Sequence, residues 1–169
     1  MSRFMVTGAS GLLGLNFALA VDGRTHQVTG VDYRNPLGWI NFKTRQADLT
    51  EPGILDKLVE EIKPEVILHC AAMANVDDCE KRPEDALRVN AILPGEIAEV
   101  AKKNNIKLVH ISTDAVFDGQ KGNYTETEEP NPLSVYAGTK REGELAVLSA
   151  NPQALVTRVN FYGWSISGI

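Results

Sequence analysis

The chain has 169 residues, a formal net charge of −5, 43% hydrophobic residues and 23% charged residues, which fits one globular α/β domain. This acidic balance, without any run of lysine and arginine, argues against nucleic-acid binding. Because no apolar stretch reaches membrane-spanning length and the first residues do not form a secretory leader, the sequence predicts a cytoplasmic protein without a membrane partner.

The first apolar run, Phe4 to Val6, leads through a glycine-rich turn, residues 7–14, into a helical stretch that ends near Val21. Strand, glycine turn and helix in this order are typical of a phosphate-binding turn, because glycine permits close backbone approach and a helix N-terminus attracts anions. The glycines are spaced G-x-x-G-x-x-G rather than G-x-G-x-x-G. Taken alone, the turn fits either cofactor binding or a plain tight junction.

A second short strand is expected from His26 to Asp32, which places Asp32 18 residues after Gly14. In a dinucleotide-binding fold, an acid at this place accepts hydrogen bonds from the adenosine ribose and repels a 2′-phosphate, which favours NADH. Arg34 could pair with such a phosphate, which leaves NADPH as an alternative. The other interpretation of Asp32 is a turn residue that closes the strand.

Breakers mark residues 33–41 as a loop, and a short third strand is expected from Phe42 to Gln46. Asp48 follows, either at the adenine edge of a cofactor or as a cap for the next helix. Thr50 is the expected N-cap of that helix, with Pro52 in its first turn.

The apolar run from Glu65 to Ala72 predicts a strand buried on both faces of a parallel sheet. Ala71 and Ala72 at its carboxyl end would let a cofactor lie against the strand, although close packing also explains small residues there. Cys70 is expected to be a buried thiol, and neither it nor Cys79 belongs to a C-x-x-C motif. The three histidines are isolated, so no metal site is expected.

A polar connection is expected over residues 75–83, followed by one long helix over residues 84–104. Asn90, a poor helix former inside that helix, either has a specific role or faces solvent. A strand over residues 107–113 then precedes a long loop, residues 114–132, of the length that functional loops have.

Ser112 and Thr113 place two hydroxyls at the carboxyl end of that strand. A helix expected from Leu133 to Ser149 carries Tyr136 and Lys140, whose spacing of four puts both side chains on one face. An ammonium beside a phenol favours the phenolate, so the pair can transfer a proton near neutral pH. Such a pair alone is usually accidental, but its place after the glycine turn and the hydroxyl-tipped strand favours a catalytic site.

A last strand is expected over residues 154–159. Six strands thus alternate with four helical patterns, which predicts a doubly wound parallel sheet of the Rossmann type. Residues 1–169 are expected to form one NAD(P)-binding domain.

These motifs resemble those of the extended short-chain dehydrogenase/reductases, in which a glycine turn of this spacing and Tyr-x-x-x-Lys occur together. The stretches Val109 to Gly119 and Pro132 to Lys140, with Cys70 to Ala72 and Val76-Asp77, narrow the likeness to the nucleotide-sugar 4-keto reductases typified by dTDP-4-dehydrorhamnose reductase. The likeness covers essentially the whole chain. It implies that the family's C-terminal substrate-binding portion is absent after Ile169.

The resemblance implies that a nucleotide sugar is reduced at its 4-keto group by hydride transfer from NAD(P)H. It makes Tyr136 the general acid, Thr113 the residue that orients the substrate carbonyl, and Lys140 the residue that holds the nicotinamide ribose and lowers the tyrosine pKa. It also implies that Asn90 supports Lys140 through water. The residues assigned to the cofactor are Gly8, Ser10, Gly11, Leu12, Gly14, Asp32, Asp48, Leu49, Ala71, Ala72, Asn90, Tyr136 and Lys140.

Two positions depart from the family pattern. Ala115 stands where these reductases have an aromatic residue, and residues 158–161, Arg-Val-Asn-Phe, stand where they have Arg-Thr-Ser-Trp. Both positions face the sugar in the family, so the identity of the sugar stays open. Two alternatives share the same residues, namely a non-catalytic NAD(P)-binding subunit like the methionine adenosyltransferase partner, and an epimerase or dehydratase. A homodimer is a further expectation.

Overall fold

The computed structural model describes residues 1–35, 37–38 and 40–163, so part of the loop expected at 33–41 lies outside it. Six parallel strands form one sheet in the order β3-β2-β1-β4-β5-β6. The strands are β1 Arg3–Thr7, β2 Gln27–Asp32, β3 Lys43–Gln46, β4 Val66–His69, β5 Lys107–Thr113 and β6 Leu155–Val159. The strand order reverses beside β1, between β2 and β4, which confirms the predicted doubly wound α/β sheet.

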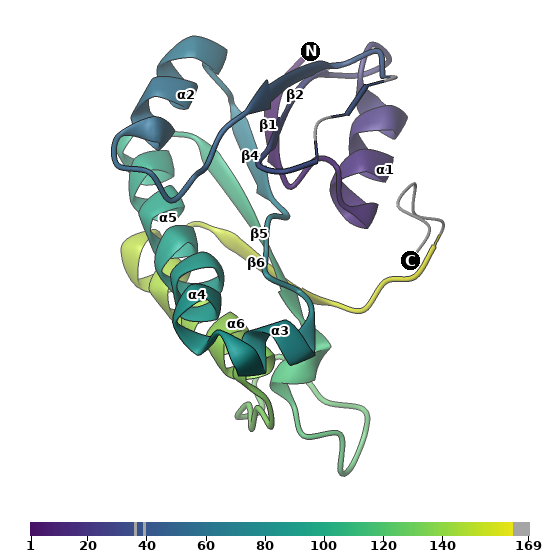
Figure 1. Cartoon of the computed structure of the whole chain (residues 1–169), viewed down its shortest axis with the longest axis vertical. Coiled ribbons are helices and arrows are strands. Elements are labelled where there is room, and N and C mark those ends of the chain that lie inside the picture. Colours follow the sequence, from purple (N-terminus) through teal and green to yellow (C-terminus); the bar gives the residue numbers. More distant parts are fainter. Residues whose placement is uncertain (36, 39, 164–169) are drawn as a thin grey trace.

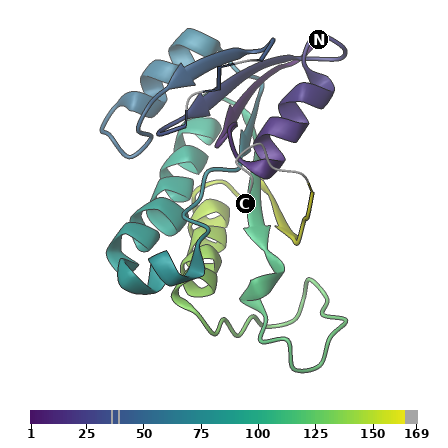
Figure 2. The ribbon, with the colours of Figure 1, turned by 45° about the vertical axis from the view of Figure 1, so that its right-hand side comes forward.

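Helices cover both faces of this sheet (Figure 1). They are α1 Leu12–Val21, α2 Ile54–Ile62, α3 Val76–Lys81, α4 Pro83–Leu87, α5 Leu93–Lys103 and α6 Val135–Ala150. Figures 1 and 2 show α1 on one side of the sheet and α2, α5 and α6 on the other. Since neighbouring strand residues point to opposite faces, Val6 packs in the cluster beside α1 while Met5 packs in the cluster beside α5.

The expectation of a single helix over residues 84–104 is wrong, because a π-helical turn, η1 Arg88–Ile92, separates α4 from α5. Pro94 has no N–H to donate to the Asn90 carbonyl four residues earlier, and its ring would collide with that carbonyl in a regular helix. The backbone instead makes a wider turn, in which the N–H of Leu93 donates to the carbonyl of Arg88.

Two further expectations about helix boundaries are wrong. The polar connection over residues 75–83 contains α3, whose N-terminus is capped by the Asn75 side chain accepting from the Asp78 N–H. Thr50 does not cap α2, because its N–H and hydroxyl both donate to Asp48 and close a separate turn. The helix begins after Gly53, which takes a left-handed conformation with φ 78°.

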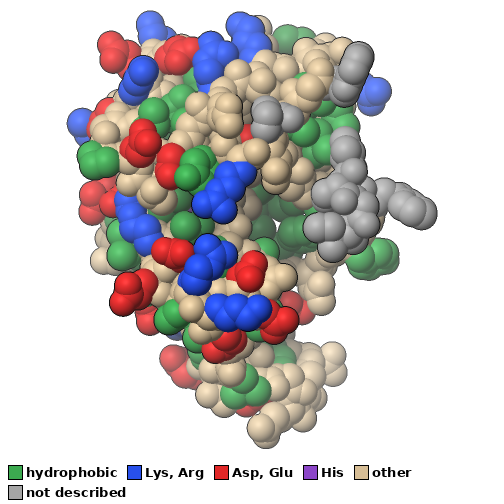
Figure 3. Space-filling model, viewed as in Figure 1, with side chains coloured by type: hydrophobic (Ala, Val, Ile, Leu, Met, Phe, Trp, Pro, Cys, Tyr) green, Lys and Arg blue, Asp and Glu red, His purple; other side chains and the backbone are tan. Residues whose placement is uncertain are grey.

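Charged side chains of both signs are interspersed on the face that carries α2, α4 and α5 (Figure 3). Below them, the loop over residues 114–132 extends beyond the body of the domain (Figures 1 and 2). Among the described residues, no helix is long and apolar enough to cross a membrane.

Candidate cofactor and active site

A cavity of about 680 Å³ lies at the carboxyl ends of β1, β2 and β4. Open parallel sheets bind their ligands at this edge, next to the point where the strand order reverses. The glycine turn, the end of β2, the start of the segment after β3 and the end of β4 all contribute residues. Those predicted from sequence to bind a cofactor and found in the lining are Gly8, Ser10, Gly11, Leu12, Gly14, Asp32, Asp48, Leu49, Ala71 and Ala72.

Two glycines of the turn are required by the packing around them. Gly8 has φ 65°, and a Cβ there would lie 2.8 Å from the backbone nitrogen of Ala71. A Cβ on Gly14 would lie 2.5 Å from the Gly8 carbonyl oxygen. The N-terminus of α1 has no side-chain cap and no acidic residue in its first turn, so its free N–H groups stay available to an anion. The turn therefore fits a pyrophosphate.

Asp32 joins the glycine turn to the end of β2. Its Oδ1 accepts hydrogen bonds from the Ser10 N–H at 2.7 Å and from the Ser10 hydroxyl at 2.8 Å. Its Oδ2 is buried and has no partner among the described residues. A buried carboxylate oxygen without a partner is costly, so a ribose hydroxyl at this place would relieve that cost. Sequence reasoning missed the bond to Ser10, because no local pattern pairs these residues.

The sequence left two roles open for Asp48, contact with the cofactor and capping of the next helix, and the structure bears on both. It lines the cavity, and it closes the turn that ends at Thr50, whose hydroxyl donates to it at 2.6 Å. This hydrogen bond is the main cause that lowers the pKa of Asp48. Asp48 does not cap α2 itself. Arg34 also lines the cavity, as do Arg82 and Arg88, which had no signal in the sequence because surface arginines on helices are common.

The N-terminus of α6, the helix that carries Tyr136 and Lys140, is capped by two side chains. The Ser134 hydroxyl oxygen accepts from the Ala137 N–H at 3.2 Å, and the Glu80 carboxylate on α3 accepts from the Val135 N–H at 2.8 Å. Both bonds satisfy donors that an α-helix leaves open in its first turn. They fix the start of α6 one residue before Tyr136.

Lys140 lies one turn further along α6 and is 3% exposed. Its ammonium donates a hydrogen bond to the Ile111 carbonyl of β5 at 2.6 Å, and Ile111 lines the cavity. Burial lowers the pKa of Lys140 from its usual 10.5 to about 8. The ammonium is therefore held beside the carboxyl end of β5 and stays charged at neutral pH.

Tyr136 is partly buried, and burial raises the pKa of its phenol. The nearby hydroxyl of Thr113 on β5 acts in the opposite direction but does not reverse the shift. The expected lowering of the Tyr136 pKa by Lys140 is thus wrong for the chain on its own, because the ammonium is directed to the Ile111 carbonyl. The structure does bring Tyr136, Thr113 and Lys140 to the same end of β5.

Asn90 lies in the π-helical turn and is buried rather than solvent-facing. Its side-chain oxygen accepts from the Met73 N–H at 2.8 Å, and its amide donates to the Met73 carbonyl at 3.0 Å and to the Thr139 hydroxyl at 3.2 Å. These bonds hold the segment after β4 against α6. The Asn90 side chain makes no direct bond to Lys140, and support through water stays a prediction.

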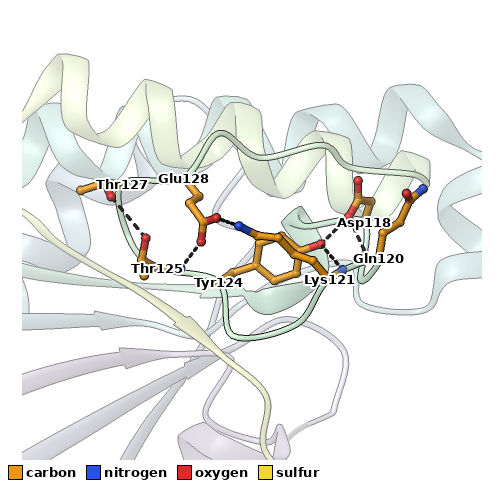
Figure 4. Close-up of polar contacts among 7 residues, drawn as sticks. All are labelled: Asp118, Gln120, Lys121, Tyr124, Thr125, Thr127 and Glu128. Carbon is orange, nitrogen blue, oxygen red and sulfur yellow. Dashed lines mark hydrogen bonds and ion pairs between the residues drawn. The ribbon is translucent and has the colours of Figure 1, made fainter.

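The loop over residues 114–132 is ordered by its own side chains (Figure 4). The Tyr124 hydroxyl donates to Asp118, and Lys121 pairs with Glu128. The Tyr124 ring stacks on Phe117 with centroids 4.4 Å apart. The bond from Tyr124 is the main cause that lowers the pKa of Asp118 to about 2.

Within residues 1–35, 37–38 and 40–163, no three histidine, cysteine, aspartate or glutamate side chains lie together as a possible metal-ion site. His69 and His110 are buried neighbours in the sheet, with ring centroids 5.4 Å apart. Cys70 lines the cavity, and burial raises the pKa of its thiol to about 12. It is therefore a protonated, unreactive thiol at neutral pH.

Sequence comparison places this site in a known family. The family model described as RmlD substrate binding domain matches residues 2–164. This chain belongs to the RmlD family. The match runs from the glycine turn through β6, so it includes every part of the RmlD-family site described above.

Two curated relatives of this RmlD-family chain have different functions. The chain is 39% identical over 160 residues to the probable low-salt glycan biosynthesis reductase Agl14 of Haloferax volcanii, covering 94% of this chain and 53% of that protein. It is 35% identical over 157 residues to methionine adenosyltransferase 2 subunit beta of Bos taurus, covering 93% and 46%. The chain spans about half the length of these relatives.

Two solved structures share the fold and were obtained with nicotinamide cofactors. A dTDP-4-dehydrorhamnose reductase from Bacillus anthracis in complex with NADP has a TM-score of 0.80 and 29% identity, covering 93% of this chain and 52% of that chain. MoeE5 in complex with UDP-glucose and NAD has a TM-score of 0.78 and 26% identity, covering 92% and 52%.

Proposed function

We propose that residues 1–169 are the NAD(P)-binding domain of a reductase that acts on the 4-keto group of a nucleotide sugar. The observation that carries this proposal is the convergence of Tyr136, Lys140 and Thr113 at the end of β5, beside a cavity built on the glycine turn. The complexes of similar proteins with NADP, and with UDP-glucose and NAD, support it.

The glycine turn and the N-terminus of α1 would hold the pyrophosphate, and Oδ2 of Asp32 would accept from the adenosine ribose. Lys140 would hold the nicotinamide ribose. When bound, the reduced nicotinamide supplies a hydride.

The oxygen of a keto group gains negative charge as its carbon is reduced and needs a proton. Tyr136 can supply it, because its phenol is protonated at neutral pH and the developing alkoxide is a stronger base than the phenolate that remains. The Thr113 hydroxyl donates a hydrogen bond to the same oxygen. The buried charge of Lys140 stabilises the developing alkoxide in a site of low dielectric constant.

We propose NADH as the preferred cofactor, because the carboxylate of Asp32 repels a 2′-phosphate. Arg34 lies in the same cavity and can pair with that phosphate, so NADPH should bind as well. Cofactor titrations by fluorescence quenching test this. Arg34→Ala should weaken NADPH binding several-fold and leave NADH binding unchanged. An equal loss for both cofactors would contradict the assigned role of Arg34.

A second candidate function is a regulatory subunit that binds NAD(P) without reducing a sugar. The 35% identity to methionine adenosyltransferase 2 subunit beta favours it. A cytoplasmic location and a homodimer stay predictions from the sequence.

Tyr136→Phe separates the two functions. It removes the proton donor and keeps the ring, so we expect turnover of nucleotide 4-keto sugars to fall at least about 100-fold. The Kd for NADH should stay within about twofold, since the phenol hydroxyl adds little to cofactor affinity. Tyr162→Phe, at a side chain that is 98% exposed, is the matched control and should change neither quantity. Full activity of Tyr136→Phe would overturn the proposed mechanism, and cofactor binding by the unmodified protein without oxidation on any sugar would favour the regulatory subunit.

A further inference from the structure

Glu144 is a buried carboxylate on α6 that the proposed mechanism leaves without a role, and it is 1% exposed. Its Oε1 accepts from the Ser112 hydroxyl at 2.6 Å and from Nε of Arg158 at 2.9 Å. Its Oε2 accepts from Nη2 of Arg158 at 2.8 Å and from Nη1 of Arg141 at 3.0 Å. Each oxygen of this carboxylate thus accepts two hydrogen bonds, and the donors belong to Ser112 on β5, Arg158 on β6 and Arg141 on α6 itself.

The donors around Glu144 come from the segments that surround the active site. Ser112 directly precedes Thr113 at the end of β5. Arg158 belongs to β6, and its guanidinium lies 5.0 Å from the ring centroid of Phe117, at the start of the long loop. Glu144 therefore connects α6, β5, β6 and that loop through side chains alone.

Packing alone does not explain why a charge stands at this place. A buried ion pair is weak evidence for stability, because apolar residues of similar volume often hold the same elements together equally well. A buried carboxylate is needed where nearby cations require its negative charge, as Arg141 and Arg158 do here. Lys140 lies one turn earlier on the same helix and is also buried.

Four titratable groups face the ammonium of Lys140, and they come from β4, the segment directly after it, β5 and α6. Burial lowers the pKa of His69 on β4 and of His110 on β5, so both rings are neutral. Burial raises the pKa of the Cys70 thiol to about 12, so it is neutral as well. Glu144, by contrast, is ionised, because its bonds from Arg158 and Ser112 outweigh the effect of burial and lower its pKa.

We propose that Glu144 is a positioning residue for the sugar reduction: its carboxylate holds Ser112 and Arg158 against α6 and offsets the positive charges of Arg141 and Arg158 beside the buried ammonium of Lys140. The inference rests on the proposed function for its catalytic consequence. Its electrostatic part concerns this chain alone, since burial lowers the pKa of Lys140 to about 8 and the charge of Glu144 acts against that lowering.

Glu144→Gln tests the electrostatic part, because glutamine keeps the shape and removes the charge. The protonation midpoint of Lys140 is measured by NMR titration of its Cε and Nζ signals, without cofactor or substrate. We expect the midpoint to fall by about one pH unit or more, since the charges of Arg141 and Arg158 are then unbalanced. Glu142→Gln, at an exposed position of the same helix, is the matched control and should not move it.

Two further variants separate charge from position. Ser112→Ala removes one hydrogen bond and keeps every charge, so kcat should fall several-fold while the Lys140 midpoint stays in place. Arg158→Gln removes a positive charge, so the midpoint should rise, which keeps the test available if Glu144→Gln fails to fold. An unchanged Lys140 midpoint in folded Glu144→Gln, or in Arg158→Gln, would overturn the inference.

The sugar assay distinguishes this inference from the proposed function. If the unmodified protein reduces no sugar but the Lys140 midpoint moves in Glu144→Gln, the proposed function fails and the charge balance stands. If sugars are reduced and the high-pH limb of the kcat profile is the same in Glu144→Gln as in the unmodified protein, the role of Glu144 in the reaction is wrong.

Discussion

Two histidines buried side by side in the sheet should make the domain sensitive to acid. His69 and His110 are direct neighbours across β4 and β5, and both are almost fully buried. The Thr7 hydroxyl hydrogen-bonds Nδ1 of His69 at 2.7 Å. Among the described residues, neither Nε2 of His69 nor either ring nitrogen of His110 has a hydrogen-bond partner. In the described part of the folded chain, no hydrogen-bond acceptor therefore stabilises the doubly protonated, charged form of either ring.

The direction of the effect follows from the lowered pKa of both histidines, and its size follows from the pKa of His110. Burial lowers the pKa of His69 well below 6.5 and that of His110 to about 3, whereas both titrate near 6.5 in an unfolded chain. Below about pH 6.5 these two histidines bind protons in the unfolded chain but stay neutral in the folded chain. Stability is therefore full above that pH and falls as the pH drops toward about 3. At pH 5 the loss from His110 is about 2 kcal/mol, and His69 adds a loss in the same direction.

Urea denaturation at pH 7.5 and pH 5.0 measures this loss in the unmodified protein and in His110→Phe. Phenylalanine keeps an aromatic ring and removes both unpartnered nitrogens. The variant should lose about 2 kcal/mol less than the unmodified protein between the two pH values. Above pH 7.5 the difference between the two proteins should be constant, which serves as the internal control. An equal acid loss in both proteins would refute the reasoning.

Two other predictions concern the packing of α6 and the long loop. A Cβ on Gly143 would lie 2.2 Å from the Asn90 carbonyl oxygen, so Gly143→Ala should destabilise the fold by about 1–3 kcal/mol in urea denaturation. Gly138→Ala on the same helix meets nothing within 4 Å and should instead stabilise it, by up to about 1 kcal/mol. Asp118→Asn removes the charge that organises the loop, and limited trypsin digestion should cleave after Lys121 faster than in the unmodified protein; an equal cleavage rate would show that Asp118 does not order the loop.

The sheet and the cavity were predictable because their signals are local. Apolar runs that end in glycine, in Asp32 or in small residues mark the strands and their carboxyl ends. Parallel pairing then brings those ends to one edge, whatever the contacts elsewhere. Pro94 was also a visible signal for the break between α4 and α5, since proline inside a helical pattern removes a hydrogen bond.

Contacts between residues that are distant in the sequence could not be predicted from it. Spacing placed Tyr136 and Lys140 on one face of α6, but it did not give the direction of the long lysine side chain, which reaches the Ile111 carbonyl. The direction of the Tyr136 pKa shift was likewise mispredicted, because it is set by burial, which depends on elements that pack against α6. The Glu144–Arg158 pair joins a helix to the edge strand β6 and has no local pattern.

The most direct test of the account follows the hydride itself. The protein is incubated with cofactor deuterated at nicotinamide C4, as NADH and as NADPH, and with a panel of nucleotide 4-keto sugars. The account predicts a sugar product heavier by one mass unit, with the deuterium located at sugar C4 by NMR, and no such product from Tyr136→Phe. Tight binding of the cofactor without deuterium in any sugar would contradict it.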